Sequence, residues 1–220
     1  TNKYFASIQF EYEKEVEQVQ PKSYLGLDFA MSDFYVDSEG IKGNYPKFFR
    51  KSQEKLAKEQ RKLSRMVKGS NNYNKQKIKV AKVYEKIANQ RKDFLHKTSR
   101  KIANSYDVVC VEDLNMKAMS QTFKFGKSVH DNGWGMFVQM LRYKLEELGK
   151  YLIVADKFFP STKQCSACLN KKDGIHLSER TYECSSCNLK IDRDLNAALN
   201  LKQYAIESLQ VSKVSSDFVI

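Results

Sequence analysis

The sequence predicts an α/β domain, in which a mixed sheet is covered by helices and carries a long basic helical hairpin and a four-cysteine insert. Three observations lead to this prediction. Short apolar runs alternate with segments of helical period, as in a sheet with helices on its faces. Residues 47–101 carry half of the Lys and Arg of the chain. Two Cys-x-x-Cys pairs follow within 165–187.

The first part of the chain is predicted to form strands. Residues 4–20 are expected to be extended and amphipathic, up to Pro21. An apolar run that contains one carboxylate follows at 24–30, and turn residues separate two further runs at 34–36 and 40–45. Short apolar runs between turn residues are typical of strands, here a meander of three.

Two long antiparallel helices are predicted over 47–105, separated by a polar break at 69–72. Apolar residues recur with helical period in two narrow stripes, and a narrow stripe covers only one neighbouring element. The stripes are Phe49, Leu56, Leu63 and Met66, and then Val80, Val83, Ile87, Phe94 and Ile102. Much of this hairpin is therefore expected to be exposed.

The charge of the hairpin indicates a polyanionic partner. Residues 47–101 hold 19 of the 38 Lys and Arg and 4 of the 26 acids, a net charge of +15 against −3 for the rest of the chain. A short lysine run is more often a solvated helix face, but this density favours contact with phosphates. The residues predicted to contact nucleic acid are Lys51, Lys55, Lys58, Arg61, Lys62, Arg65, Lys75, Lys79, Lys82, Lys86, Arg91 and, beyond the hairpin, Arg193.

The second half of the chain is predicted to alternate between strands and helices. Buried-type strands are expected at 107–112 and 151–155, with a helix at 133–148 between them. Strand–helix–strand crossovers imply parallel pairing. Residues 113–132 are polar and lack a period, which indicates a mobile loop. The last helix is expected from Asp194 to about Ser208, with its inward face formed by Leu195, Ala198, Leu199, Ile206 and Leu209.

The four paired cysteines predict a structural zinc site. Each Cys-x-x-Cys makes a tight turn that directs two sulfurs to one point, and two such turns complete a tetrahedral thiolate site. The predicted ligands are Cys165, Cys168, Cys184 and Cys187. The alternative, two redox pairs, needs a thioredoxin-like context that the sequence lacks. His176 is expected at the surface of the insert, and the unpaired Cys110 in the core.

Three carboxylates predict a second metal site. Asp28 lies in the first strand, Glu112 ends the fourth, and Asp194 opens the last helix. If those strands are neighbours and the helix packs across them, the carboxylates converge, and clustered carboxylates repel one another without a cation. They suit two Mg²⁺ or Mn²⁺ ions that hydrolyse a phosphodiester. Alternatively, Asp194 is a helix cap and Glu112 a surface residue at a strand end.

Several motifs together resemble the TnpB (OrfB) proteins of insertion sequences, which are similar to type V CRISPR effectors. The motifs are YLGLD at 24–28, VVCVEDLN at 108–115, NGWGMF at 132–137, the cysteine pairs and DRDLNAA at 192–198. The resemblance covers about residues 20–208. Each motif is weak alone, but their order and spacing together are specific.

This resemblance implies an RNase H-like (RuvC) fold, a guide RNA from the transposon end, and cleavage of DNA beside a target motif. The family's catalytic acids fall on Asp28, Glu112 and Asp194, with Asp192 a weaker candidate for the third, and its zinc ligands fall on the paired cysteines. The family also has an N-terminal region before its first catalytic strand. Only residues 1–20 resemble a part of it, so we expect an N-terminally truncated chain.

The resemblance also implies a division of the chain. The expected parts are a remnant of the N-terminal wedge-type region at 1–20, a nuclease core at 21–160, a zinc ribbon at 161–191, the final core helix at 192–210 and a tail at 211–220.

Three functions are therefore weighed. The first is an RNA-guided, Mg²⁺-dependent DNA endonuclease of transposons. The second is a catalytically silent nucleic-acid-binding remnant or repressor, and the third a zinc-ribbon interaction module with incidental acids. The sequence has no apolar stretch of 18 residues, which argues against a membrane partner. The expected location is the prokaryotic cytoplasm, with the chain on the nucleoid when bound to DNA.

Overall fold

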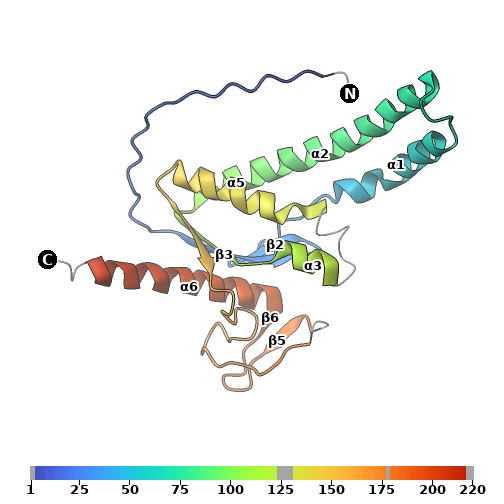
Figure 1. Ribbon diagram of the computed structural model, residues 1–220. Coiled ribbons are helices and arrows are strands. Elements are labelled where there is room, and N and C mark those ends of the chain that lie inside the picture. The colour runs from blue at the N-terminus through green and yellow to red at the C-terminus, as the bar shows by residue number, and fades with distance from the viewer. Residues whose placement is uncertain (1–2, 123–130, 177–178, 217–220) are drawn as a thin grey trace.

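The computed structural model describes residues 3–122, 131–176 and 179–216. Its centre is a mixed sheet with the strand order β2-β1-β3-β4 (Figure 1). The strands are β1 (Tyr24–Ala30), β2 (Phe34–Asp37), β3 (Val108–Glu112) and β4 (Tyr151–Ala155). β1 is antiparallel to β2 and parallel to β3, which is parallel to β4. The predicted parallel pairing is confirmed.

Helices cover both faces of this sheet, as predicted. Figure 1 shows α2 and α5 on one side and α6 on the other, with the four-cysteine insert beside the start of α6. The helices are α1 (Phe48–Ser64), α2 (Asn71–Ser105), α3 (Met116–Thr122), α5 (Trp134–Glu146) and α6 (Arg193–Ser216). The insert contains an antiparallel pair, β5 (Thr181–Glu183) and β6 (Lys190–Asp192).

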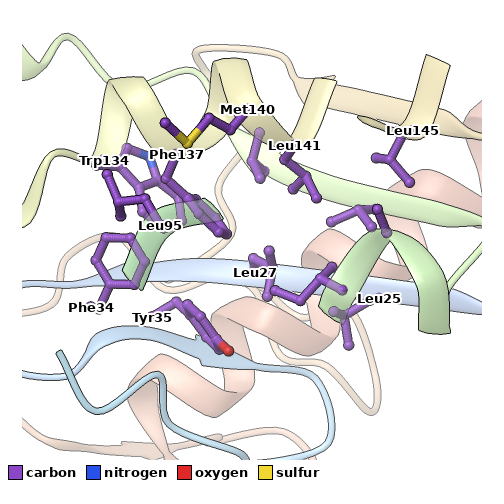
Figure 2. Packing of buried hydrophobic residues seen from close by; sticks show 14 of the residues in the cluster. Leu25, Leu27, Phe34, Tyr35, Leu95, Trp134, Phe137, Met140, Leu141 and Leu145 are labelled. Atoms are coloured by element: carbon purple, nitrogen blue, oxygen red, sulfur yellow. The ribbon is translucent and has the colours of Figure 1, made fainter. Parts of the chain in front are cut away.

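The larger core lies between the sheet and the helices α2 and α5 (Figure 2). Leu25 and Leu27 of β1 point into it, because alternate residues of a strand face opposite sides. Phe34 is fully buried there and packs edge-on against Trp134 and Phe137.

The opposite face of the sheet packs against α6. Cys110 of β3 is buried there with Leu201 and Ala205 of α6, so the expected core role of this cysteine is confirmed. Gly26 of β1 marks the closest approach, since a Cβ at this position would lie 1.9 Å from the carbonyl oxygen of Ala198. The first turns of α6 therefore lie directly over β1.

The helices α1 and α2 form the predicted hairpin, which projects from the sheet (Figure 1). A small apolar cluster that includes Leu56, Val83 and Ile87 joins the two helices. Ser70 caps α2, because its side chain accepts a hydrogen bond from the N–H of Tyr73 at 3.1 Å. Because only a narrow seam is buried in the part that projects from the sheet, most of the surface of this part is exposed.

The predicted third strand at 40–45 is wrong. One isolated bridge, between Val36 and Lys42, represents it. The carboxylate of Asp37 instead accepts hydrogen bonds from the N–H groups of Glu39 and Ile41, at 2.9 and 2.8 Å. A side chain therefore satisfies backbone groups that a strand partner would otherwise bind.

The predicted loop at 113–132 is wrong at 116–122, where α3 forms; its residues 123–130 lie outside the described part of the chain. Asn115 starts this helix, since its side chain accepts a hydrogen bond from the N–H of Ala118 at 2.9 Å. A cap of this kind can start a short helix in a segment whose apolar residues show no helical period.

The predicted inward face of α6 is also partly wrong, and the helix extends beyond the expected end to Ser216. Of the five residues predicted to face inward, Ala198 is buried and the others are only partly buried. Beside Leu201, the buried face consists of small and polar residues, namely Asn196, Ala197, Ala198, Asn200 and Ala205. The close contact with β1 explains this choice, because large side chains would hold the helix away.

Candidate active site

The three predicted acids line a single cavity of about 690 Å³. Leu25 and Leu27 point into the larger core, so Asp28 faces the α6 side of the sheet, where it is 5% exposed. Glu112, at the end of the adjacent strand β3, faces the same side. Asp194 enters from the first turn of α6. Three segments distant in the chain therefore supply the carboxylates.

The environment of Asp28 and Glu112 is unfavourable to their charged forms. Burial raises the pKa of Asp28 well above its ordinary value, and the nearby Glu112 and Asp194 carboxylates raise it further, while Arg193 opposes them. Burial also raises the pKa of Glu112, and a hydrogen bond from Ser161 opposes that shift. A cation in the cavity would relieve this repulsion.

Glu112 and Asp194 each already accept a hydrogen bond from another side chain. An oxygen of Asp194 accepts hydrogen bonds from Nη2 and Nε of Arg193, at 3.1 and 3.2 Å. Glu112 accepts a hydrogen bond from the Ser161 hydroxyl. Asp192, rather than Asp194, caps α6, because its carboxylate accepts from the N–H groups of Asp194 and Leu195 at 2.9 and 3.1 Å. Asp194 therefore does not serve as the cap, and its side chain lines the cavity.

The acids share a cavity but do not form a tight cluster. Within the described ranges 3–122, 131–176 and 179–216, only the four paired cysteines bring three or more ligand atoms within 4.8 Å of one another. The three carboxylates are spaced more widely.

Basic residues surround the acids, and sequence reasoning missed most of them. Lys47, Arg50 and Arg180 line the cavity together with the predicted Arg193. They come from the start of the hairpin and from the cysteine insert. No local pattern distinguishes them from other surface lysines and arginines, because only the fold brings these segments to one cavity.

A buried aspartate connects the hairpin to the same cavity. Asp131 is 4% exposed and lines the cavity wall. Its carboxylate accepts hydrogen bonds from the Tyr45 hydroxyl at 3.1 Å and the Phe49 N–H at 3.2 Å, and Arg91 lies 3.9 Å away. Arg91, predicted to contact nucleic acid, thus lies apart from the exposed lysines. Sequence reasoning missed Asp131 because it lies in a segment without a period.

Ten of the twelve residues predicted to contact nucleic acid are exposed on the hairpin, whereas Arg91 and Arg193 are partly buried. Lysines from both helices line a groove of about 490 Å³ between α1 and α2, namely Lys55, Lys62, Lys79, Lys82 and Lys86. Lysine side chains recognise phosphates as point charges, so this groove is suited to a nucleic-acid backbone.

The four paired cysteines form a compact thiol cluster. The Sγ atoms of Cys165 and Cys187 are 3.6 Å apart, and those of Cys168 and Cys184 are 3.5 Å apart. A tetrahedral zinc–thiolate site has Zn–S bonds of about 2.3 Å and hence sulfur–sulfur edges of roughly 3.8 Å. The cluster could therefore bind zinc with four protein ligands. His176 is exposed, as predicted.

The two cysteine turns share one backbone geometry. The N–H of Leu169 donates to the carbonyl of Cys165, and that of Asn188 donates to the carbonyl of Cys184, both at 3.0 Å. Leu169 and Asn188 both have left-handed φ angles, 62° and 61°. The spacing of the cysteines thus encodes two equivalent turns that face each other.

Two family models match the chain. The OrfB_IS605 model, described as a probable transposase, matches residues 7–122, and the model of a Cas12f1-like TNB domain matches residues 134–201.

Individual relatives agree with these matches. A protein of Streptomyces pristinaespiralis named as an RNA-guided DNA endonuclease is 36% identical over 177 residues, and InsQ of Escherichia coli K12, named likewise, is 31% identical over 215. These alignments cover 80% and 90% of the chain but 44% and 53% of the relatives, so the chain spans about half of their length.

The fold also resembles a solved structure. A Cas12f1–sgRNA–target DNA complex superposes with a TM-score of 0.58 at 18% identity, over 85% of the chain and 51% of the Cas12f1 chain. This likeness supports the mixed α/β fold. Among the described residues, no helix combines the length and the apolar character needed to cross a membrane.

Proposed function

Because the chain belongs to the OrfB_IS605 family of probable transposases, we propose that it is the nuclease portion of an RNA-guided DNA endonuclease, built on an RNase H-like (RuvC) core. One observation carries the proposal: Asp28, Glu112 and Asp194, from three distant segments, line one cavity. Two relatives named as RNA-guided DNA endonucleases support the substrate class.

The chemistry of the acid cavity would suit two divalent ions. The buried Asp28 carboxylate is destabilised by its two acidic neighbours, and oxygen ligands of this kind are those that Mg²⁺ and Mn²⁺ prefer. Asp28, Glu112 and Asp194 would hold the ions. The chemistry that such ions would supply is activation of a water molecule and stabilisation of negative charge on the leaving 3′ oxygen.

The residues of the chain itself would position the substrate. Lys47, Arg50 and Arg180, around the cavity, would bind the phosphates that flank the scissile bond. The side chain of Arg193 pairs with Asp194 and limits where this carboxylate can turn. The exposed lysines of the hairpin would hold the nucleic-acid backbone, and pairing with a guide RNA from the transposon end would supply sequence recognition.

The cysteine cluster would hold one structural zinc ion. Four protein ligands leave no open coordination position, so the ion would fold the insert rather than take part in hydrolysis. Apart from the cysteines, few apolar residues are buried in the insert, with Tyr182 the largest. Zinc binding would therefore supply much of its folding free energy.

A second candidate is a nucleic-acid-binding protein without nuclease activity, such as a repressor. The observation that favours it is that the oxygen atoms of the three carboxylates do not all lie within 4.8 Å of one another and that Arg193 already pairs with Asp194. Such a protein would bind nucleic acid with strong salt dependence and leave it intact.

Cleavage of single-stranded DNA tests the choice between these functions. We expect cleavage by the zinc-loaded chain that requires Mg²⁺ or Mn²⁺, and complete loss with Asp28→Ala. Binding without cleavage at any divalent ion concentration would support the second candidate, and equal cleavage by Asp28→Ala would show that the acid assignment is wrong.

Sequencing of RNA that copurifies with the chain tests guidance. A discrete RNA from one end of a transposon is expected, and heterogeneous cellular RNA would contradict guidance.

A further inference from the structure

Ser161 connects the four-cysteine insert to the acid cavity. Its hydroxyl donates a hydrogen bond to Oε1 of Glu112, and the residue is 3% exposed. Glu112 ends β3, whereas Ser161 stands four residues before Cys165 in a different segment of the chain. The contact therefore joins the start of the insert to an acid that the core strand supplies.

Helix α6 holds Ser161 in place through two buried asparagines one turn apart. Nδ2 of Asn200 donates to the carbonyl oxygens of Ser161 and Gln164, each at 2.7 Å. Asn196 donates to the carbonyl of Gln164 at 2.7 Å and accepts from the N–H of Ser166 at 2.9 Å. Buried amides are costly unless they are bonded, so residues 161–166 have little freedom to leave the helix.

We propose that Ser161 is a positioning residue of the nuclease site, which fixes the Glu112 carboxylate toward the metal-binding cavity while Asn200 fixes Ser161. The inference rests on the proposed nuclease function. A carboxylate that can rotate away from its ligand position binds a metal more weakly, and partners that hydrogen-bond to metal ligands contribute about 10–100-fold to metal affinity. The cysteine insert would thus contribute to the geometry of the acid site without touching substrate.

The affinity of the zinc-loaded full chain for Mn²⁺, measured by electron paramagnetic resonance in the absence of nucleic acid, tests this role. Ser161→Ala should weaken Mn²⁺ binding by roughly 10-fold or more, and Ser161→Thr, which keeps the hydroxyl, should restore most of the affinity. Ser185→Ala is the matched control, since it makes the same change at an exposed serine of the cysteine insert and should bind Mn²⁺ like the parent.

A second measurement does not depend on the divalent ion. In zinc-loaded protein without Mg²⁺ or Mn²⁺, Ser161→Ala should lower the melting temperature by roughly 2–4 °C, as expected for one buried hydrogen bond. In a Glu112→Ala background the same change should cost less than half as much, because the acceptor is missing. Equal losses in both backgrounds would place the contribution of Ser161 elsewhere.

The outcomes separate the two proposals. If the parent does not bind Mn²⁺, or if Asp28→Ala binds it equally well, the proposed nuclease function fails and the positioning role fails with it. If the parent binds Mn²⁺ in an Asp28-dependent manner and Ser161→Ala binds it just as tightly, only the positioning role of Ser161 is overturned.

Discussion

Each of the two cysteine turns contains one residue with a left-handed backbone, but this residue is a leucine in the first turn and an asparagine in the second. Asn adopts positive φ readily, whereas a leucine in this conformation costs about 1–2 kcal/mol. Leu169 has φ 62° and is 53% exposed, so it buries little surface in return. Leu169→Asn should therefore stabilise the insert by up to about 1 kcal/mol, measured as resistance to zinc extraction by a chelator.

Asn188→Leu makes the reverse substitution in the second turn and serves as the control for this prediction. Asn188 occupies the equivalent place in the second turn, with φ 61°. We expect this variant to lose zinc at a lower chelator concentration than the parent. Faster zinc loss from Leu169→Asn would contradict a strained turn.

The raised pKa of Asp28 predicts how stability depends on pH. Burial and the neighbouring acids raise the folded-state pKa of Asp28, so folding disfavours its charged form. This penalty is absent below the ordinary aspartate pKa and grows as the pH rises through the folded-state value. Without Mg²⁺, Asp28→Asn should therefore gain melting temperature relative to the parent as the pH is raised above about 4.

Asp173→Asn serves as the control for the pH series, because Asp173 is exposed in the cysteine insert. Its melting temperatures should follow those of the parent at each pH. A difference in melting temperature between Asp28→Asn and the parent that stays constant with pH would show that the buried carboxylate does not titrate as proposed.

The sequence predicted that three acids converge because each stands at a chemically informative place, namely within an apolar strand, at a strand end and at a helix start, and all three line one cavity. It could not identify Lys47, Arg180 or Asp131, which line the same cavity. The pattern within one segment holds no information about which distant segment it faces, so these residues required the fold.

At the scale of helices and strands, the lysine groove of the hairpin gives a measurable prediction. Each lysine–phosphate contact contributes about 0.7–0.9 to the slope of log affinity against log salt concentration. Replacing Lys55, Lys79 and Lys82 together with Ala should lower this slope by roughly 2–3, measured by fluorescence anisotropy with single-stranded nucleic acid over a range of salt concentrations.

Lys97→Ala provides the comparison from the same helix. Lys97 is paired with Asp93 at 2.8 Å, so its removal should change the salt slope little. An unchanged slope in the triple variant would place nucleic acid on another surface.

The periodic elements followed from the sequence, whereas two short ones did not. Short apolar runs predicted the four strands of the sheet and apolar residues of helical period predicted the two hairpin helices, since burial of apolar side chains decides these elements. Hydrogen bonds between side chains and nearby backbone groups explain the two differences. Asp37 bonds to the backbone where the third strand was predicted, and Asn115 caps α3. The spacing of apolar residues carries no information about such side-chain-to-backbone hydrogen bonds.

At the scale of the whole molecule, Gly26 controls the packing of α6 on the sheet. A Cβ here would lie 1.9 Å from the Ala198 carbonyl oxygen and 2.6 Å from the Lys202 nitrogen. Gly26→Ala must therefore displace α6 and with it Asp194, and we expect destabilisation of roughly 3 kcal/mol or more. Urea unfolding measures the loss.

Gly135→Ala is the opposite case within the same fold. Gly135 lies in α5 and has no atom within 4 Å of an added Cβ, so alanine should stabilise the protein by about 0.5–1 kcal/mol. If Gly26→Ala is as well tolerated as this control, the close contact between β1 and α6 is incorrect.

Strand β6 ends at Asp192 and α6 begins at Arg193, so no linker separates the cysteine insert from the helix that carries Asp194. If cysteine inserts are exchanged between related proteins at this junction, β6 and the first turn of α6, which it orients, come from different proteins. Functional chimaeras should therefore tolerate a crossover point after the second turn of α6, beyond Asn200, and lose activity when the crossover lies between 190 and 195.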